Sequence, residues 1–326
     1  MLIASYIVLA VLVIGLSMRL SSYVDMLDKQ TNLSGAFLGG VMLAAVTSLP
    51  ELFTSISGVV FLNEPELVVG NILGSNLFNL AALSLVSLFG IKVIQRAAVS
   101  SSQGKTVLFS LAIYALLAVV AGDFFHIYFA GINIASFVII LLYIWGIKSL
   151  SLDDSSTEEA ELAGDLSARA ILLRFALLSL LLVLVSVSLT FVTDLLSQKY
   201  NLGVSFAGAV FLGVATSLPE LVSTIQLVRL GNYNAACGNI LGSNLFNFTI
   251  LAIADFLYTA GTVYIFDYQS MVMLFCGAVA CLTMLLFVRS KTTRRQLRRP
   301  RRTFAYNMLL MLLGAACYWL FLLLTV

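Results

Sequence analysis

The stretch Thr47–Leu52, TSLPEL, is followed by Gly70–Asn79, GNILGSNLFN, and both blocks recur at Thr216–Leu221 and Gly238–Asn247. All sixteen positions are identical between the two copies, with an offset of 169 residues for the first block and 168 for the second. A match of this length within one chain indicates an internal repeat. The chain therefore consists of two related halves, and these blocks mark what the halves share.

The composition indicates a membrane protein. Hydrophobic residues make up 60% of the 326 residues, charged residues only 10%, and the mean hydropathy is +1.03. Soluble domains are about 45–50% apolar and about 25% charged, so the solvent of this chain is lipid. No pair of nucleophile and base is identifiable within the apolar segments. We therefore expect no enzyme, no cofactor and no nucleic-acid partner.

The hydropathy pattern predicts an all-α polytopic membrane protein with ten transmembrane helices. The expected spans are residues 2–20, 34–62, 66–90, 106–122, 127–149, 170–195, 203–229, 233–258, 269–289 and 304–325. The repeated blocks fall in spans two and three and in spans seven and eight. Because an odd number of crossings separates the copies, they run through the membrane in opposite directions. Two inverted five-helix repeats of this kind are typical of secondary transporters with a site near the membrane midplane.

The charges predict an orientation and a division of the chain. Of the 18 Lys and Arg residues, 17 lie in alternate connections and only Lys199 lies on the opposite side. Since Lys and Arg accumulate in cytoplasmic loops, we expect the basic loops in the cytoplasm and both termini outside. The polar and acidic segment 151–169 is interpreted as a cytoplasmic linker between a first repeat at 1–150 and a second at 170–326.

Two acidic residues, Glu51 and Glu220, occupy equivalent positions deep in spans two and seven. A charged side chain at that depth costs at least about 2.5–3.5 kcal/mol on insertion scales. No Lys, Arg or His lies at matching depth in the sequence. We therefore infer that the two carboxylates receive a diffusible cation or protons.

Further oxygen atoms cluster around each glutamate in the sequence. Pro50 and Pro219 each disrupt a helical hydrogen bond, which predicts carbonyls facing a cavity about one turn earlier. Hydroxyl and amide side chains at spacings of three and four residues share a helical face with one another. The candidate cation ligands are Glu51, Glu220, Thr47, Thr216, Ser48, Ser217, Ser75, Ser243, Asn79, Asn247 and the carbonyls of Ala44 and Gly213.

This donor set favours particular ions. It contains only hard oxygen atoms, which suit calcium and sodium, whereas transition metals favour His or Cys. Two carboxylates also balance one divalent charge. An emptied pocket would hold two buried negative charges, which are costly to carry through a closed intermediate. Obligatory exchange of one cation for another follows.

The repeated blocks resemble the alpha repeats of the sodium/calcium exchanger family, within the cation/calcium antiporter superfamily. The resemblance covers both halves and implies ten helices, with spans two, three, seven and eight as the core and spans one and six sliding across it. It implies calcium ligation by Glu51 and Glu220 with the Thr47 and Thr216 carbonyls. Sodium sites would add Ser48, Ser75, Ser217, Ser243 and the Ala44 and Gly213 carbonyls, with Asn79 and Asn247 at positions that carry Asn or Asp in the family.

Details of the motifs refine what the resemblance implies. Asn79 and Asn247 are both Asn, whereas potassium-dependent exchangers carry Asp at one such position, which disfavours potassium coupling. Neither GNILGSN copy holds the further acidic residue typical of proton/calcium antiporters, which favours sodium. A sodium/calcium antiporter of a prokaryotic plasma membrane is thus expected. A proton/divalent cation antiporter and, less favoured, a cation channel stay open as alternatives, and the oligomeric state is not predicted.

Overall fold

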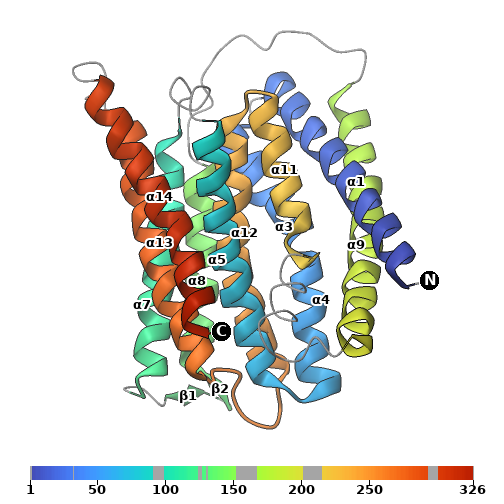
Figure 1. Ribbon diagram of the computed structural model, residues 1–326, viewed down its shortest axis with the longest axis vertical. Helices are drawn as coiled ribbons and strands as arrows, with labels where there is room; N and C mark the ends of the chain where they lie inside the picture. The colour runs from blue at the N-terminus through green and yellow to red at the C-terminus, as the bar shows by residue number, and fades with distance from the viewer. Residues whose placement is uncertain are drawn as a thin grey trace.

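The computed structural model describes residues 2–31, 33–90, 99–123, 127–129, 131–151, 167–200, 215–292 and 300–325, and these are nearly all helical (Figure 1). The first half contains α1 (Leu2–Gln30), a broken second span, α5 (Pro65–Phe89), α7 (Ser101–Ala121) and α8 (Ile134–Ser151). The second half contains α9 (Ala168–Lys199), α11 (Leu218–Arg229), α12 (Tyr233–Leu257), α13 (Tyr268–Thr292) and α14 (Pro300–Thr325).

The expected fold class, an all-α polytopic membrane protein of two inverted five-helix repeats, is confirmed. Eight described helices are long and apolar enough to cross a bilayer, and Ile134–Leu150 of α8 is a shorter apolar helix. Span seven is described only from residue 215 onward, where α11 follows. The predicted start of span five is corrected: a small antiparallel hairpin, β1 (Tyr128–Phe129) and β2 (Ile132–Asn133), precedes α8.

The helices form a central group flanked on two sides. Helix α12 packs against α5, α7, α8, α11 and the broken second span, and 78% of its most apolar window is buried. Helices α1 and α9 pack against each other on one flank and run in opposite directions, while α7, α13 and α14 lie on the other flank (Figure 1). Only 11% of the corresponding window of α1 is buried. Its exposed side chains include large apolar ones, as expected for a surface in contact with lipid: Ile3, Ile7, Val8, Val11 and Leu12.

The second span is divided into five short pieces. These are α2 (Gly35–Phe37), the π-helix η1 (Leu38–Leu43), α3 (Ala44–Thr47), α4 (Leu49–Ser57) and the π-helix η2 (Gly58–Leu62). Ser48 leaves the helical conformation between α3 and α4, with φ −90° and ψ 5°, and Ser217 does the same before α11, with φ −90° and ψ 9°. Pro50 and Pro219 then fall in the first turn of a new helix, where a missing N–H is tolerated. The helix disruption predicted at the two prolines is present in both halves.

Helix α12 approaches η1 backbone to backbone. A Cβ atom added to Gly238 would lie 2.8 Å from the Ala36 carbonyl oxygen and from the Gly40 nitrogen, and one added to Gly242 would overlap the Gly40 carbonyl oxygen. Small residues at such positions allow close helix packing in membranes. The packing brings α3, which follows η1, next to the repeated block on α12.

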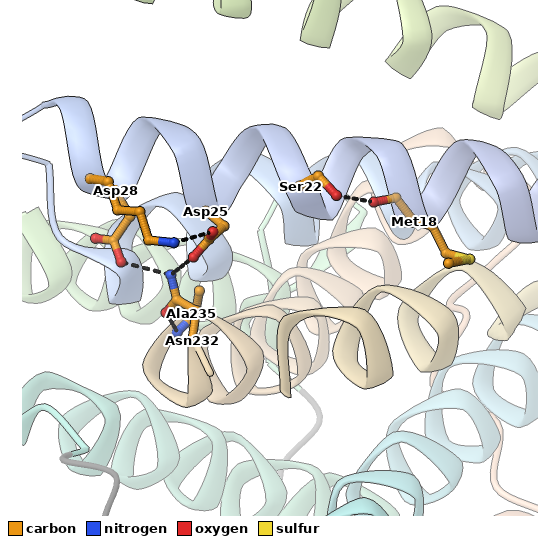
Figure 2. A network of polar contacts seen from close by, with 7 residues as sticks. Met18, Ser22, Asp25, Asp28, Asn232 and Ala235 are labelled. Atoms are coloured by element: carbon orange, nitrogen blue, oxygen red, sulfur yellow. Dashed lines mark hydrogen bonds and ion pairs between the residues drawn. The ribbon is translucent and has the colours of Figure 1, made fainter. Parts of the chain in front are cut away.

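Helix α1 is longer than the sequence predicted, because it continues to Gln30 and not to residue 20. Asp25, which lies between the predicted spans 2–20 and 34–62, is only 5% exposed. Its Oδ2 accepts a hydrogen bond from Lys29 Nζ at 2.7 Å, and its Oδ1 accepts one from Asn232 Nδ2 at 3.2 Å. Asn232 Nδ2 also donates to Asp28 Oδ2 at 2.7 Å, and Asn232 Oδ1 caps α12 by accepting from Ala235 N (Figure 2). This network ties the end of α1 to the start of α12.

The other end of α12 is held by a buried aspartate, Asp255. Its Oδ1 accepts hydrogen bonds from Thr262 Oγ1 at 3.0 Å and Val263 N at 3.1 Å. Its Oδ2 accepts from Asn133 N at 3.0 Å and Ser136 Oγ at 2.7 Å. Four donors thus surround this carboxylate, and it joins α12 to the hairpin, to α8 and to the segment before α13.

Candidate cation site

The two glutamates of the repeats lie at equivalent places in the fold. Glu51 is in the first turn of α4 and Glu220 in the first turn of α11, directly after the breaks at Ser48 and Ser217. Both side chains are 0% exposed. The N-terminal turn of a helix stabilises negative charge, so the breaks place each carboxylate where the backbone favours it.

Serines of one half bind the glutamate of the other half. Ser48 Oγ donates to Glu220 Oε1 at 3.1 Å, and Ser217 Oγ donates to Glu51 Oε1 at 3.2 Å. Ser75 Oγ of α5 donates to Glu51 Oε1 at 3.4 Å. The structure therefore brings both TSLPEL blocks into one buried site.

Thr47 of α3 and Ser243 of α12 form a further contact between the two halves. Thr47 Oγ1 lies 3.5 Å from Ser243 Oγ of α12, and Ser243 Oγ donates to the Ala44 carbonyl at 3.4 Å. Thr216 is buried like Thr47. The predicted free carbonyl of Ala44 is corrected, because it also accepts the backbone N–H of Ser48 at 3.1 Å. Its proposed counterpart Gly213 lies outside the described residues.

Asparagines of the second block form hydrogen bonds with one another across α5 and α12. Asn79 Nδ2 donates to Asn244 Oδ1 at 3.1 Å, and Asn247 Nδ2 donates to Asn76 Oδ1 at 2.9 Å. These bonds place two predicted ligands, Asn79 and Asn247, at the interface of α5 and α12. Asn76 and Asn244 were not predicted to be cation ligands, since amides in membrane helices often serve helix packing.

Two further asparagines hold the backbone of the glutamates. Asn71 Nδ2 donates to the Glu51 carbonyl at 3.4 Å and to Ser55 Oγ at 3.0 Å. Asn239 Nδ2 donates to the Glu220 carbonyl at 3.2 Å and to Thr224 Oγ1 at 3.1 Å. The signal for this role was the identical placement of Asn in both GNILGSN copies, but the sequence does not show which carbonyl each amide reaches.

Four buried oxygens of the site accept no hydrogen bond from the described residues. They are Glu51 Oε2, Glu220 Oε2, Asn79 Oδ1 and Asn247 Oδ1. Buried polar atoms normally have a partner, and no basic side chain in the described part of the chain forms an ion pair with either glutamate. All four are hard oxygens, and such a set fits a calcium or sodium ion. The transported ion is cargo and not a resident cofactor.

An inverted repeat with a buried, oxygen-lined site between its halves is the architecture of a secondary membrane transporter. Comparison with known proteins identifies the family. The model of the family described as sodium/calcium exchanger protein matches residues 1–146 and 170–325. The chain belongs to this family. It is therefore a multi-pass integral membrane transporter of the cation/calcium antiporter class, not an enzyme.

Individual relatives agree with this assignment. The inner membrane protein YrbG of Escherichia coli is 27% identical over 287 residues, which cover 81% of this chain and 85% of YrbG. The putative antiporter CaxA of Alkalimonas amylolytica is 27% identical over 260 residues, covering 78% of this chain and 79% of CaxA. The solved structure of the sodium-calcium exchanger NCX_Mj, soaked with 2.5 mM Na+ and 10 mM Sr2+, matches with a TM-score of 0.73 at 20% identity and 98% coverage of both chains. This likeness supports the ten-helix fold.

Proposed function

We propose that the protein exchanges sodium for calcium across the membrane by alternating access, with Glu51 and Glu220 sharing the cation sites near the midplane. One observation carries the proposal: two buried glutamates, joined by crossed serine hydrogen bonds, keep carboxylate oxygens without a donor or a basic partner among the described residues. A buried charge of this kind requires compensation. A bound cation supplies it.

In the proposed site, calcium is held by both carboxylates and by the carbonyls of Thr47 and Thr216. Sodium ions use the same carboxylates. Their further ligands are Ser48, Ser75, Ser217, Ser243, Asn79, Asn247 and the carbonyls of Ala44 and Gly213. The Ala44 carbonyl accepts the Ser48 N–H at 3.1 Å and the Ser243 hydroxyl at 3.4 Å, so a sodium ion bound there takes the place of the longer serine contact.

The charge balance supports exchange instead of one-way flow. One divalent ion neutralises two carboxylates, whereas an empty site would carry two buried charges through the closed intermediate. The GNILGSN copies contain no acidic residue, which supports sodium over protons as the counter-ion. In the membrane, we propose both termini outside and the segment 151–169 as a cytoplasmic linker between repeats at 1–150 and 170–326. The name of YrbG, an inner membrane protein, supports a prokaryotic plasma membrane.

Radioactive calcium uptake into proteoliposomes tests the proposal, with an imposed sodium gradient, an imposed proton gradient, or no gradient. We expect uptake that needs sodium inside the vesicles, and we expect Glu51→Gln and Glu220→Gln to abolish it because each removes a charge that calcium requires. The matched control is Glu66→Gln, at an exposed position of α5, which should transport like the wild type.

Other results would contradict the proposal in distinguishable ways. Uptake driven by a proton gradient without sodium would indicate the proton-coupled alternative. Conductance with no counter-ion would indicate a channel. Wild-type rates in both glutamine variants would show that the site assignment is wrong.

A further inference from the structure

We infer that Asn76 and Asn244 are positioning residues that turn the amide oxygens of Asn247 and Asn79 toward the cation. The inference rests on the proposed function, because it explains how two uncharged side chains of the site present oxygen and not nitrogen. The amide group carries both at its end, and the two are nearly equal in size. Only the surrounding hydrogen bonds decide which one faces an ion.

The orientation begins at two backbone carbonyls. Asn76 Nδ2 donates to the Asn244 carbonyl at 3.2 Å, and Asn244 Nδ2 donates to the Asn76 carbonyl at 3.0 Å. A carbonyl oxygen only accepts hydrogen bonds. The nitrogen of each side chain must therefore face the opposite helix, and its Oδ1 must face away from that carbonyl.

A second pair of hydrogen bonds then sets the orientation of the Asn247 and Asn79 amides. Asn76 Oδ1 accepts from Asn247 Nδ2 at 2.9 Å, and Asn244 Oδ1 accepts from Asn79 Nδ2 at 3.1 Å. Since an amide oxygen also only accepts, Asn247 and Asn79 must offer their nitrogens here. Turning either amide over would place two oxygens against each other and lose a hydrogen bond.

Asn79 and Asn247 share a helix face with the two serines, Ser75 and Ser243, that contact the site. Asn79 follows Ser75 by four residues on α5, and Ser75 donates to Glu51. Asn247 follows Ser243 by four residues on α12, and Ser243 contacts Thr47 and the Ala44 carbonyl. Residues four apart lie on the same face of a helix. Both Oδ1 atoms are buried and accept no hydrogen bond from the described residues, as expected for oxygens that a cation occupies.

Substitution of the positioning residues tests the inference. In Asn76→Ala the Asn247 amide loses its acceptor and is free to turn its nitrogen to the ion. We expect the KM for calcium in sodium-driven uptake to rise about 10–100-fold, the usual loss when an outer partner of a metal ligand is removed, with a much smaller change in kcat. Asn244→Ala should act in the same way through Asn79.

A rescue distinguishes positioning from packing. A carboxylate has two equivalent acceptor oxygens and no nitrogen, so it needs no orientation. We therefore expect Asn76→Ala combined with Asn247→Asp to have the KM of Asn247→Asp alone, and Asn244→Ala combined with Asn79→Asp to match Asn79→Asp. If the double variant instead has a higher calcium KM than the aspartate variant alone, by the factor that the alanine substitution causes in the wild type, Asn76 and Asn244 only pack the helices and the inference is wrong.

Thermal unfolding of each purified full-length variant in detergent, with and without calcium, accompanies the flux. If Asn76→Ala fails to fold, the uptake measured with Asn244→Ala and its Asn79→Asp combination tests the inference, and the reverse holds if Asn244→Ala fails to fold. Wild-type transport with an unchanged KM in the alanine variants would overturn the positioning role while the proposed function stands. If the wild type shows neither uptake nor stabilisation by calcium or sodium, both the proposed function and this inference fail.

Discussion

The middle and the ends of the repeated helices are built differently. In the middle, several contacts of one half recur in the other: Ser48 binds Glu220 as Ser217 binds Glu51, and Asn71 and Asn239 hold equivalent carbonyls. At the ends of α5 and α12 the equivalence is lost. Residues at these ends are compared by the 168-residue offset that relates the second blocks, which pairs Glu64 with Asn232 and Ser87 with Asp255.

The end positions show what replaces the symmetry. Asn232 caps α12 and binds Asp25 and Asp28 of α1, whereas its counterpart Glu64 precedes α5 without a side-chain capping bond. Asp255 joins four donors near the end of α12, whereas its counterpart Ser87 shares one hydrogen bond with Tyr233 at 2.7 Å. A helix end needs only some satisfied partner, so each half can use a different one. The proposed cation site, in contrast, needs oxygens from both halves at once.

The largest expected effect concerns the close packing that forms the middle. Gly242→Ala places a methyl group into the Gly40 backbone of η1, and overpacking of this kind costs about 1–3 kcal/mol or more. We expect little folded protein, measured as the monodisperse fraction in size-exclusion chromatography. Gly15→Ala in α1, where a Cβ meets open space, is the control. A normal yield of Gly242→Ala would show that the two backbones separate without cost.

The next effect compares the far ends of α12 and α5. Asp255→Asn replaces one acceptor oxygen with a donor in the middle of four donors, and we expect a loss of about 1.5–3 kcal/mol, the value of hydrogen bonds to charged groups. Ser87→Ala should lose about 1 kcal/mol. Thermal unfolding measures both, and calcium KM should be unchanged. A changed KM with unchanged stability would mean that Asp255 belongs to the transport site.

A smaller effect is expected at the start of α12. Asn232→Ala removes the cap and the link to α1, which should cost about 0.5–2 kcal/mol of stability. Glu64→Ala, at the corresponding position before α5, removes no capping bond and should be neutral in the same unfolding assay. Equal losses in the two variants would contradict the structural difference between the ends.

The smallest effect tests the equivalence of the middle itself. Ser48→Ala and Ser217→Ala each remove one hydrogen bond to a glutamate. Because a bound cation already compensates the charge of that glutamate, we expect the value of a neutral hydrogen bond, about 0.5–1.5 kcal/mol. Each should raise the calcium KM by a similar factor of a few-fold in the uptake assay. A strong effect in one variant and none in the other would show that the halves do not share the site equally.

The sequence by itself determined the fold class, the inverted repeat and the placement of the two glutamates within it, although the end of span one and the start of span five were wrong. Hydropathy and sequence identity are properties of consecutive residues, and a carboxylate deep in an apolar span is unusual wherever the helices pack. The break before Pro50 and Pro219 was also predictable, since it depends on the local backbone. Which ions move, and in which orientation the chain lies, are predictions that the transport experiments test.

The tertiary structure alone decided which groups meet. Asp25 falls between the predicted spans 2–20 and 34–62, yet it is buried against Asn232, 207 residues away in the chain. The hydrogen bonds from Ser48 and Ser217 to the glutamates likewise join residues of opposite halves. So do the hydrogen bonds among the four asparagines of α5 and α12. A hydrogen bond depends on the distance and direction between two groups, and for partners this far apart only the packing of the helices sets both.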